Sequence, residues 1–308
     1  MPTGTSSAKP TIAEVKKQVD KLYHEAEAAQ ERYHDANLEL TELRRELTTL
    51  RADQERQRVA TELVRAEVED SVVAQYEGQT ISAVGQVIVS DDPQAFLGQL
   101  STMTAYNELQ NSLYADYAIE LKALKLRTQA TNQRARQVAT VEQRLRSEQQ
   151  QIDDKLAEAK QVLGELEEEE RQRLLAQAAS GGPVELPSNI SASGRAALAV
   201  RYAMAQVGDA YVYGAAGPNA FDCSGLTMMA WAQAGVGLPH SSSAQFGSGP
   251  HIPASALQPG DLVFYYSPIS HVAMYIGNGL IVHAAHPGAG VRVAGLYSMP
   301  YVGAVRPG

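Results

Sequence analysis

The sequence predicts a long all-α coiled-coil hairpin over residues 1–180, followed by an α+β domain with an antiparallel sheet over residues 194–308. Heptad spacing of apolar residues indicates the hairpin, and short β-type runs between Gly- and Pro-rich turns indicate the sheet. Charge divides the chain in the same way, because its net charge of −9 belongs to the first part, and neither lysine nor glutamate follows residue 194. No basic run favours a nucleic-acid partner.

The first helix is expected over residues 11–75. Apolar or small residues alternate three and four apart from Ile12 to Leu50, and the pattern resumes after a stutter near Val59, Leu63, Ala66 and Val73. A second helix over 94–178 has its clearest seam between Val138 and Leu166. A short apolar tip at 76–93 favours an antiparallel hairpin, and a parallel homodimer is the alternative.

Residues 181–193 are expected to be a linker, since they include Pro183 and Pro187 and lack Lys and Arg. A helix near 194–207 follows. Five β-type runs then cover residues 262–266, 272–276, 280–284, 291–293 and 301–305. Helices followed by adjacent strands are typical of an α+β domain with an antiparallel sheet.

The chain's only cysteine, Cys223, lies in the pentapeptide Phe-Asp-Cys-Ser-Gly at 221–225, directly before a helical pattern that Gly235 closes. Unpaired N–H groups and the positive dipole end of a helix stabilise a thiolate in the first turn. Cys223 is therefore a candidate nucleophile, and the alternative is a small buried hydrophobic residue.

A nucleophilic cysteine needs a base, and the base needs a group that orients it. His271 begins one strand pattern and His283 lies on the next. A two-residue loop would pair Met274 with His283 and put the histidines on opposite sheet faces. A three-residue loop at 277–279 pairs Ala273 with His283 and puts both on one face, which is the arrangement we expect.

These motifs resemble the NlpC-type family of papain-like cell-wall endopeptidases. The matching runs are Tyr211–Gly214, Asp222–Gly225, Leu238–Ser242 with Gln245, Leu257–Phe264, His271–Gly277 and Ile281–Ala284. The resemblance implies a papain-like fold, Cys223 as nucleophile, His271 as base and His283 as the residue that orients His271. It also implies a stem-peptide subsite, and the candidate substrate-binding residues are Tyr211, Asp222, Ser224 and Ser242. His240 stands where many relatives carry Arg.

The order of coiled coil and domain resembles the exported Rip-type endopeptidases of actinobacteria. That resemblance implies a secreted, wall-associated enzyme whose signal peptide has been removed, cleavage between D-isoglutamate and the diamino acid of peptidoglycan stems, and docking of the tip on an FtsEX-type membrane complex. We expect no cofactor and no metal, since the histidines lack ligand spacing such as His-Glu-x-x-His. The hairpin is also expected to cover Cys223. The alternative is a divisome interaction protein with a weakly active or inactive hydrolase domain.

Overall fold

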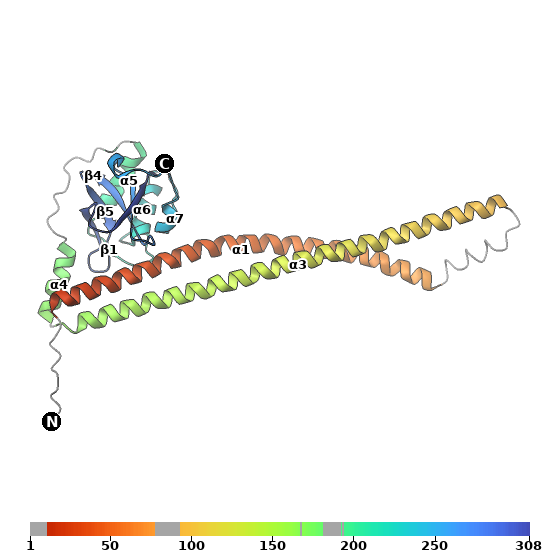
Figure 1. Cartoon of the computed structure of the whole chain (residues 1–308), viewed down its shortest axis with the longest axis horizontal. Coiled ribbons are helices and arrows are strands. Elements are labelled where there is room, and N and C mark those ends of the chain that lie inside the picture. Colours follow the sequence, from red (N-terminus) through yellow and green to blue (C-terminus); the bar gives the residue numbers. More distant parts are fainter. Residues whose placement is uncertain (1–10, 78–92, 167, 181–191, 193) are drawn as a thin grey trace, which may run out of the picture. The chain divides into compact units, whose positions relative to one another are not determined.

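The computed structural model of the chain describes residues 11–77, 93–166, 168–180, 192 and 194–308 (Figure 1). They form two compact units. One joins the part of the chain up to Glu39 with the part from Val141 onward, and the other comprises Leu40–Thr140. None of the described helices has the length and apolar character that crossing a membrane requires.

Helices α1 (Ile12–Tyr76) and α3 (Pro93–Gly164) form the predicted hairpin. In the first unit, Val15, Val19 and Leu22 pack against Ala159 and Val162, as the heptad seam predicts. The helices are antiparallel in both units, because Arg32 pairs with Glu148 at 2.9 Å in the first and Arg127 pairs with Asp53 at 2.8 Å in the second. The hairpin is therefore formed within one chain.

The seam predicted beyond Leu50 is wrong. Val59 is 48 % exposed, Leu63 is 65 % exposed and Val73 is 53 % exposed. The contact between the helices instead runs through Gln57 and Thr61, both hydrogen-bonded to Glu120 of α3. These polar side chains satisfy each other across the contact, so the apolar residues of that stretch remain on the surface.

The second helix is also shorter than predicted. It ends at Gly164, and a separate helix α4 (Glu168–Ser180) follows. At the break, the N–H groups of Glu165 and Leu166 donate to carbonyls three residues earlier, at 3.3 Å each. Gly164 weakens the helix at this point, and the break allows Leu174 of α4 to join the cluster around Val19. Apart from 76–77, 93 and 192, the predicted tip and linker lie outside the described residues.

The domain begins with α5 (Gly194–Ala205), the two-residue strands β1 (Ala210–Tyr211) and β2 (Ala220–Phe221), α6 (Cys223–Ala232), α7 (Ser242–Gln245) and a 3₁₀ turn η1 (Ala254–Ala256). Five strands follow: β3 (Leu262–Tyr265), β4 (His271–Gly277), β5 (Leu280–Ala284), β6 (Val291–Gly295) and β7 (Tyr301–Val305). They form an antiparallel sheet of order β6-β5-β4-β3-β7 (Figure 1). The observed fold class is the predicted one.

Helices α5 and α6 pack on one face of this sheet. Leu226 and Trp231 of α6 belong to the same buried cluster as Val272 and Met274 of β4 and Val282 of β5. The other face carries a second cluster that includes Tyr265 and Ile281. Because neither cluster contains a residue of α1, the domain has an apolar core of its own.

The β4–β5 hairpin differs from the prediction in its loop but agrees with it in register. Only Asn278 and Gly279 connect the strands, both with positive φ, as a type I′ turn requires. A register shift between Tyr275 and Gly277 adds one residue to β4, so Met274 pairs with Val282. His283 therefore lies opposite Ala273, and it shares a sheet face with His271.

Candidate active site

Cys223 is the first residue of α6, and its side chain is 1 % exposed. Asp222 caps the helix, because its carboxylate accepts a 2.6 Å hydrogen bond from the Gly225 N–H. Gly225 is required there, since a Cβ at that position would lie 2.3 Å from the Ala215 carbonyl oxygen. The helix ends at Ala232, and Gly235, which was predicted to close it, lies in the turn that follows, with φ of 73°. The loop before β2 and the start of α6 thus hold the cysteine in place.

His271 and His283 lie side by side beneath the cysteine. Their facing nitrogens, Nε2 of His271 and Nδ1 of His283, are 2.8 Å apart. The Nδ1 atom of His271 lies within 4.8 Å of the Cys223 sulfur. Burial, together with the charges of His271 and Arg292, lowers the pKa of His283 well below its usual value. His283 is therefore neutral and accepts a hydrogen bond when His271 is charged.

Two glutamates of α1 occupy the space over the cysteine. The Glu27 carboxylate accepts a 2.7 Å hydrogen bond from Nδ1 of His271, the nitrogen that would serve Cys223. Glu31 accepts from the Ser224 hydroxyl at 2.8 Å, from the Cys223 thiol at 3.5 Å and from the Ser242 N–H at 2.5 Å. All these residues belong to the first unit. These contacts place α1 directly against Cys223 and His271.

The same glutamates make the thiol less acidic. Burial raises the pKa of Cys223 well above its usual value, and the negative charges of Glu31, Glu27 and Asp222 raise it further. Burial, with the charge of Asp222, also raises the pKa of Glu31. Burial and these charges therefore disfavour the thiolate, which is the nucleophilic form of cysteine.

Asp222 also holds two histidines, His34 from α1 and His240 from the domain, at 2.9 and 2.8 Å. Their rings stack with centroids 3.9 Å apart. Burial acts to raise the pKa of Asp222, but the hydrogen bonds and charges of the two histidines lower it to about 2. Burial acts to lower the pKa of His34, but Asp222, Glu31 and Asp35 together raise it. A shared carboxylate thus ties α1 to the domain.

The predicted substrate-binding residues all face α1. The Tyr211 hydroxyl lies 3.4 Å from Glu27, Ser224 and Ser242 contact Glu31, and Asp222 contacts His34. The Ser242 Oγ atom is buried without a hydrogen-bond partner. The residues predicted from the domain therefore come together in one place, and α1 is what covers them.

The sequence analysis did not find the residues on the helix side. Glu27, Glu31 and His34 are spaced four and three apart, so they lie on one face of α1. Such a polar stripe beside a heptad seam normally faces solvent. The one available signal was His34 within this stripe, and its role becomes clear only from its contact with Asp222 of the domain.

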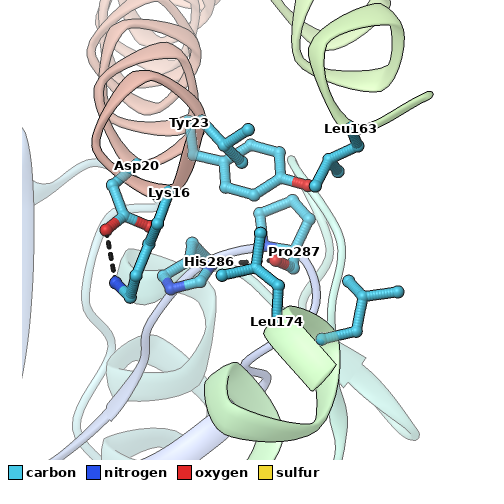
Figure 2. Close-up of a pocket in the computed structure, with 9 residues that line it drawn as sticks. Lys16, Asp20, Tyr23, Leu163, Leu174, His286 and Pro287 are labelled. Atoms are coloured by element: carbon cyan, nitrogen blue, oxygen red, sulfur yellow. Dashed lines mark hydrogen bonds and ion pairs between the residues drawn. The ribbon is translucent and has the colours of Figure 1, made fainter. Parts of the chain in front are cut away.

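A second contact fastens α1 beside the site (Figure 2). Tyr23 of α1 stacks on His286, with ring centroids 5.4 Å apart, and its carbonyl accepts a 3.0 Å hydrogen bond from Tyr213. Leu163 of α3 and Leu174 of α4 lie around the same small cavity, next to Pro287. The loop after β5 is thus held by α1, α3 and α4 together.

Residues 208–304 match the NlpC/P60 family. A probable endopeptidase of Mycobacterium tuberculosis is 49 % identical over 102 residues, which is 33 % of this chain and 26 % of that protein. A probable endopeptidase of Corynebacterium glutamicum is 43 % identical over 104 residues, 34 % of this chain and 50 % of that protein. The solved NlpC/P60 domain of the peptidoglycan hydrolase SagA is 34 % identical, covering 36 % of this chain and 97 % of that one, with a TM-score of 0.34. The chain thus spans between about a quarter and a half of the length of these two curated relatives.

Proposed function

We propose, from the premise that residues 208–304 of this chain form an NlpC/P60 domain, that it is a cysteine endopeptidase acting on peptidoglycan stem peptides. The bond we assign is the one between D-isoglutamate and the diamino acid. Residues 194–308 are the catalytic domain in this proposal, residues 181–193 a linker, and residues 1–180 a regulatory hairpin. The substrate lies outside the cell membrane, so we also propose a secreted, wall-associated protein.

Cys223 is the nucleophile in the proposed mechanism and His271 is the base. Once α1 leaves, Nδ1 of His271 takes the thiol proton and the thiolate attacks the scissile carbonyl carbon. The N–H of Cys223 stabilises the oxyanion, the C–N bond breaks, and the leaving amine takes the proton from His271. Water, activated by His271, then hydrolyses the thioester. His283 holds His271 in position by accepting a hydrogen bond from its Nε2–H, an interaction supported by the 2.8 Å distance between the two nitrogens.

The proposed regulation rests on the contact between α1 and Cys223. We define the latch as Glu27, Glu31 and His34, the three α1 side chains that contact His271, Cys223 and Asp222. The latch keeps base and nucleophile apart, since Glu27 occupies the nitrogen that Cys223 needs. We propose that the chain is an autoinhibited precursor whose activity requires displacement of α1.

The charges of the latch resemble those of a stem-peptide substrate. His34 presents a cationic group to Asp222, where we propose that the amine end of a stem peptide binds. Tyr211, Ser224 and Ser242 surround the glutamates, where we place the peptide on the other side of the scissile bond. A stem peptide and the latch therefore compete for one groove, and high local substrate concentration favours the open enzyme.

The test is release of cleaved stem peptides from purified peptidoglycan, read by mass spectrometry. Three full-length proteins are compared: the natural chain, the double variant Glu27→Lys/Glu31→Lys, and the same variant with Cys223→Ala. We expect strong cleavage by the double variant alone, with products ending in D-isoglutamate. Equal cleavage by the natural chain would refute autoinhibition. Absence of cleavage by a folded double variant that still reacts with a thiol probe would refute the substrate.

The second unit supports a second candidate function, that of an interaction module. Leu63, Leu109, Ile119 and Leu126 are each more than half exposed there. We propose that these four exposed apolar side chains take part in binding a protein partner. We propose that an FtsEX-type complex binds this hairpin and displaces the latch. Replacement of the four residues by Ser should abolish activation by the partner without changing the cleavage by the Glu27→Lys/Glu31→Lys variant. If partner binding persists, this surface is not used.

A further inference from the structure

Three metal-binding groups meet where the latch closes. The Glu27 carboxylate, the Cys223 sulfur and Nδ1 of His271 are all buried, and these ligand atoms lie within 4.8 Å of one another. Carboxylate, thiolate and imidazole are the ligands that Zn²⁺ takes in proteins. They come from α1, α6 and β4, so the cluster exists only while α1 is seated on the domain.

Small movements bring the ligand atoms to the spacing that a tetrahedral zinc ion needs. Bond lengths of about 2.0–2.3 Å place neighbouring ligand atoms about 3.3–3.6 Å apart. Nδ1 of His271 is 2.7 Å from Glu27, and the Cys223 sulfur lies within 4.8 Å of the ligand atoms of both residues. Separating the first pair by under 1 Å and bringing the sulfur nearer by at most about 1 Å would admit the ion. Glu31 or a water molecule would complete the coordination.

The surroundings favour a cation as well. Glu27 and Glu31 are both buried beside the thiol, and Glu31 lies 3.5 Å from its sulfur. These two carboxylates would attract an ion of charge +2, which would hold the cysteine as a thiolate without catalysis.

The ligands are also held from behind. Nε2 of His271 faces Nδ1 of His283 at 2.8 Å, and the Tyr211 hydroxyl lies 3.4 Å from Glu27. Partners of this kind orient metal ligands and typically strengthen binding by about 10–100-fold. They are present here in the state without metal, so little reorganisation is needed.

A second group, His34, Asp222 and His240, also lies close together. Its two imidazole rings are stacked, with an angle of 28° between their planes, and both bind the Asp222 carboxylate. This group contains no thiol, so it gives no thiolate-to-metal charge-transfer band, and a Cys223→Ser variant distinguishes it from the first group.

We propose that the closed latch binds one Zn²⁺ between Glu27, Cys223 and His271, and that the ion locks the precursor shut. Binding breaks the S–H bond of Cys223 and the Nδ1–H bond that His271 donates to Glu27, and it releases both protons to solvent. His271 keeps one proton, on Nε2, where it donates to His283. The ion occupies the nucleophile and the base together, and it dissociates when α1 withdraws Glu27. This inference rests on the proposed latch and adds a ligand to it.

The experiment measures metal binding by the full-length reduced chain, with Zn²⁺ in equilibrium dialysis and Co²⁺ as a spectroscopic substitute. We expect one ion per chain and a thiolate-to-cobalt charge-transfer band. Glu27→Gln should weaken binding by at least about 10-fold, comparable to the loss of a supporting group. Cys223→Ser should remove the band. Glu25→Gln, an exposed glutamate of the same helix, should change neither.

Zn²⁺ should also raise the unfolding temperature of the natural chain, and Glu27→Gln should lose that increase while remaining folded. The proposal is overturned if the natural chain binds no stoichiometric ion, or if Glu27→Gln or Cys223→Ser binds it with unchanged affinity. Peptidoglycan cleavage by the Glu27→Lys/Glu31→Lys variant tests the proposed function separately from the zinc site. If this variant cleaves peptidoglycan but the natural chain binds no metal, the proposed function stands and the zinc site is refuted. If the natural chain binds the metal but this variant does not cleave peptidoglycan, only the proposed function is refuted.

Discussion

Glu31→Ala should open the latch and expose the cysteine. The carboxylate of Glu31 accepts hydrogen bonds from the Ser224 hydroxyl at 2.8 Å and the Ser242 N–H at 2.5 Å. Alanine leaves the Ser242 N–H buried and unpaired while α1 stays seated, and it leaves the Ser224 hydroxyl only its longer, 3.4 Å hydrogen bond to Asp222. Water satisfies both donors when α1 leaves. Each unpaired buried donor costs about 1–3 kcal/mol.

One unpaired donor and one weakened hydrogen bond destabilise the closed state by about 2–4 kcal/mol. Removal of the carboxylate also relieves its burial, which is the main cause of its raised pKa, so the net value lies toward the lower end. A net of about 2–3 kcal/mol raises the ratio of open to closed chains roughly 30–150-fold. Glu31→Gln keeps one acceptor oxygen and should lie between the natural chain and the alanine variant.

The assay is the alkylation rate of the single cysteine in the native chain, followed by mass spectrometry. Cys223 is 1 % exposed when closed, so the rate follows the open population. Stem-peptide release from peptidoglycan should rise in parallel. Glu25→Gln is the matched control, since Glu25 makes only surface ion pairs. If Glu31→Ala reacts at the rate of the natural chain in both assays, contact with α1 is not what shields the cysteine.

Three further outcomes are expected. The pKa of His34 is raised in the closed latch. Its contribution to the stability of the closed latch is therefore complete below the ordinary pKa of 6.5, and it is lost as pH rises through the raised pKa. The natural chain should therefore be less restrained at pH 8 than at pH 6. Its alkylation rate should rise between these pH values by more than the increase in thiolate fraction alone, and His34→Gln should show only the rise that the thiolate fraction gives. In the Glu31→Ala background, His283→Ala should lower kcat by about 10²–10⁴-fold without slowing alkylation. Gly225→Ala places a Cβ 2.3 Å from the Ala215 carbonyl oxygen and should destabilise the chain by about 1–3 kcal/mol or more in thermal unfolding.

The sequence predicted most of the domain, because its strands are short, β-branched and separated by Gly and Pro turns. β5 and β7 begin and end where the pattern placed them. The pair β1–β2 was not predicted, since two residues per strand carry no periodicity. The prediction had a three-residue loop after β4, where the structure has a two-residue loop and a bulge at the end of β4. Both arrangements give His283 the same face, so a register argument alone does not distinguish them.

The latch could not be predicted from the sequence, for a different physical reason. A heptad pattern identifies the face of α1 that meets another helix, and Val15, Val19 and Leu22 were predicted in this way. Glu27 and Glu31 lie outside that seam, and charged residues there are normally solvated. Their burial depends on His271, Ser224 and Ser242, each more than 190 positions later in the chain than its partner, and no local pattern reports such a pairing.

The polar character of the latch determines how it is released. The apolar clusters of the domain include no residue of α1, and the cluster of the hairpin includes none of the domain. Withdrawal of α1 therefore exposes mainly carboxylates, imidazoles and hydroxyls, which water solvates well. Burial of those charges opposes their attraction, so a polar interface of this kind is weak relative to its number of contacts. A partner that binds the hairpin needs to supply only that small difference, and it can open the enzyme without unfolding the domain.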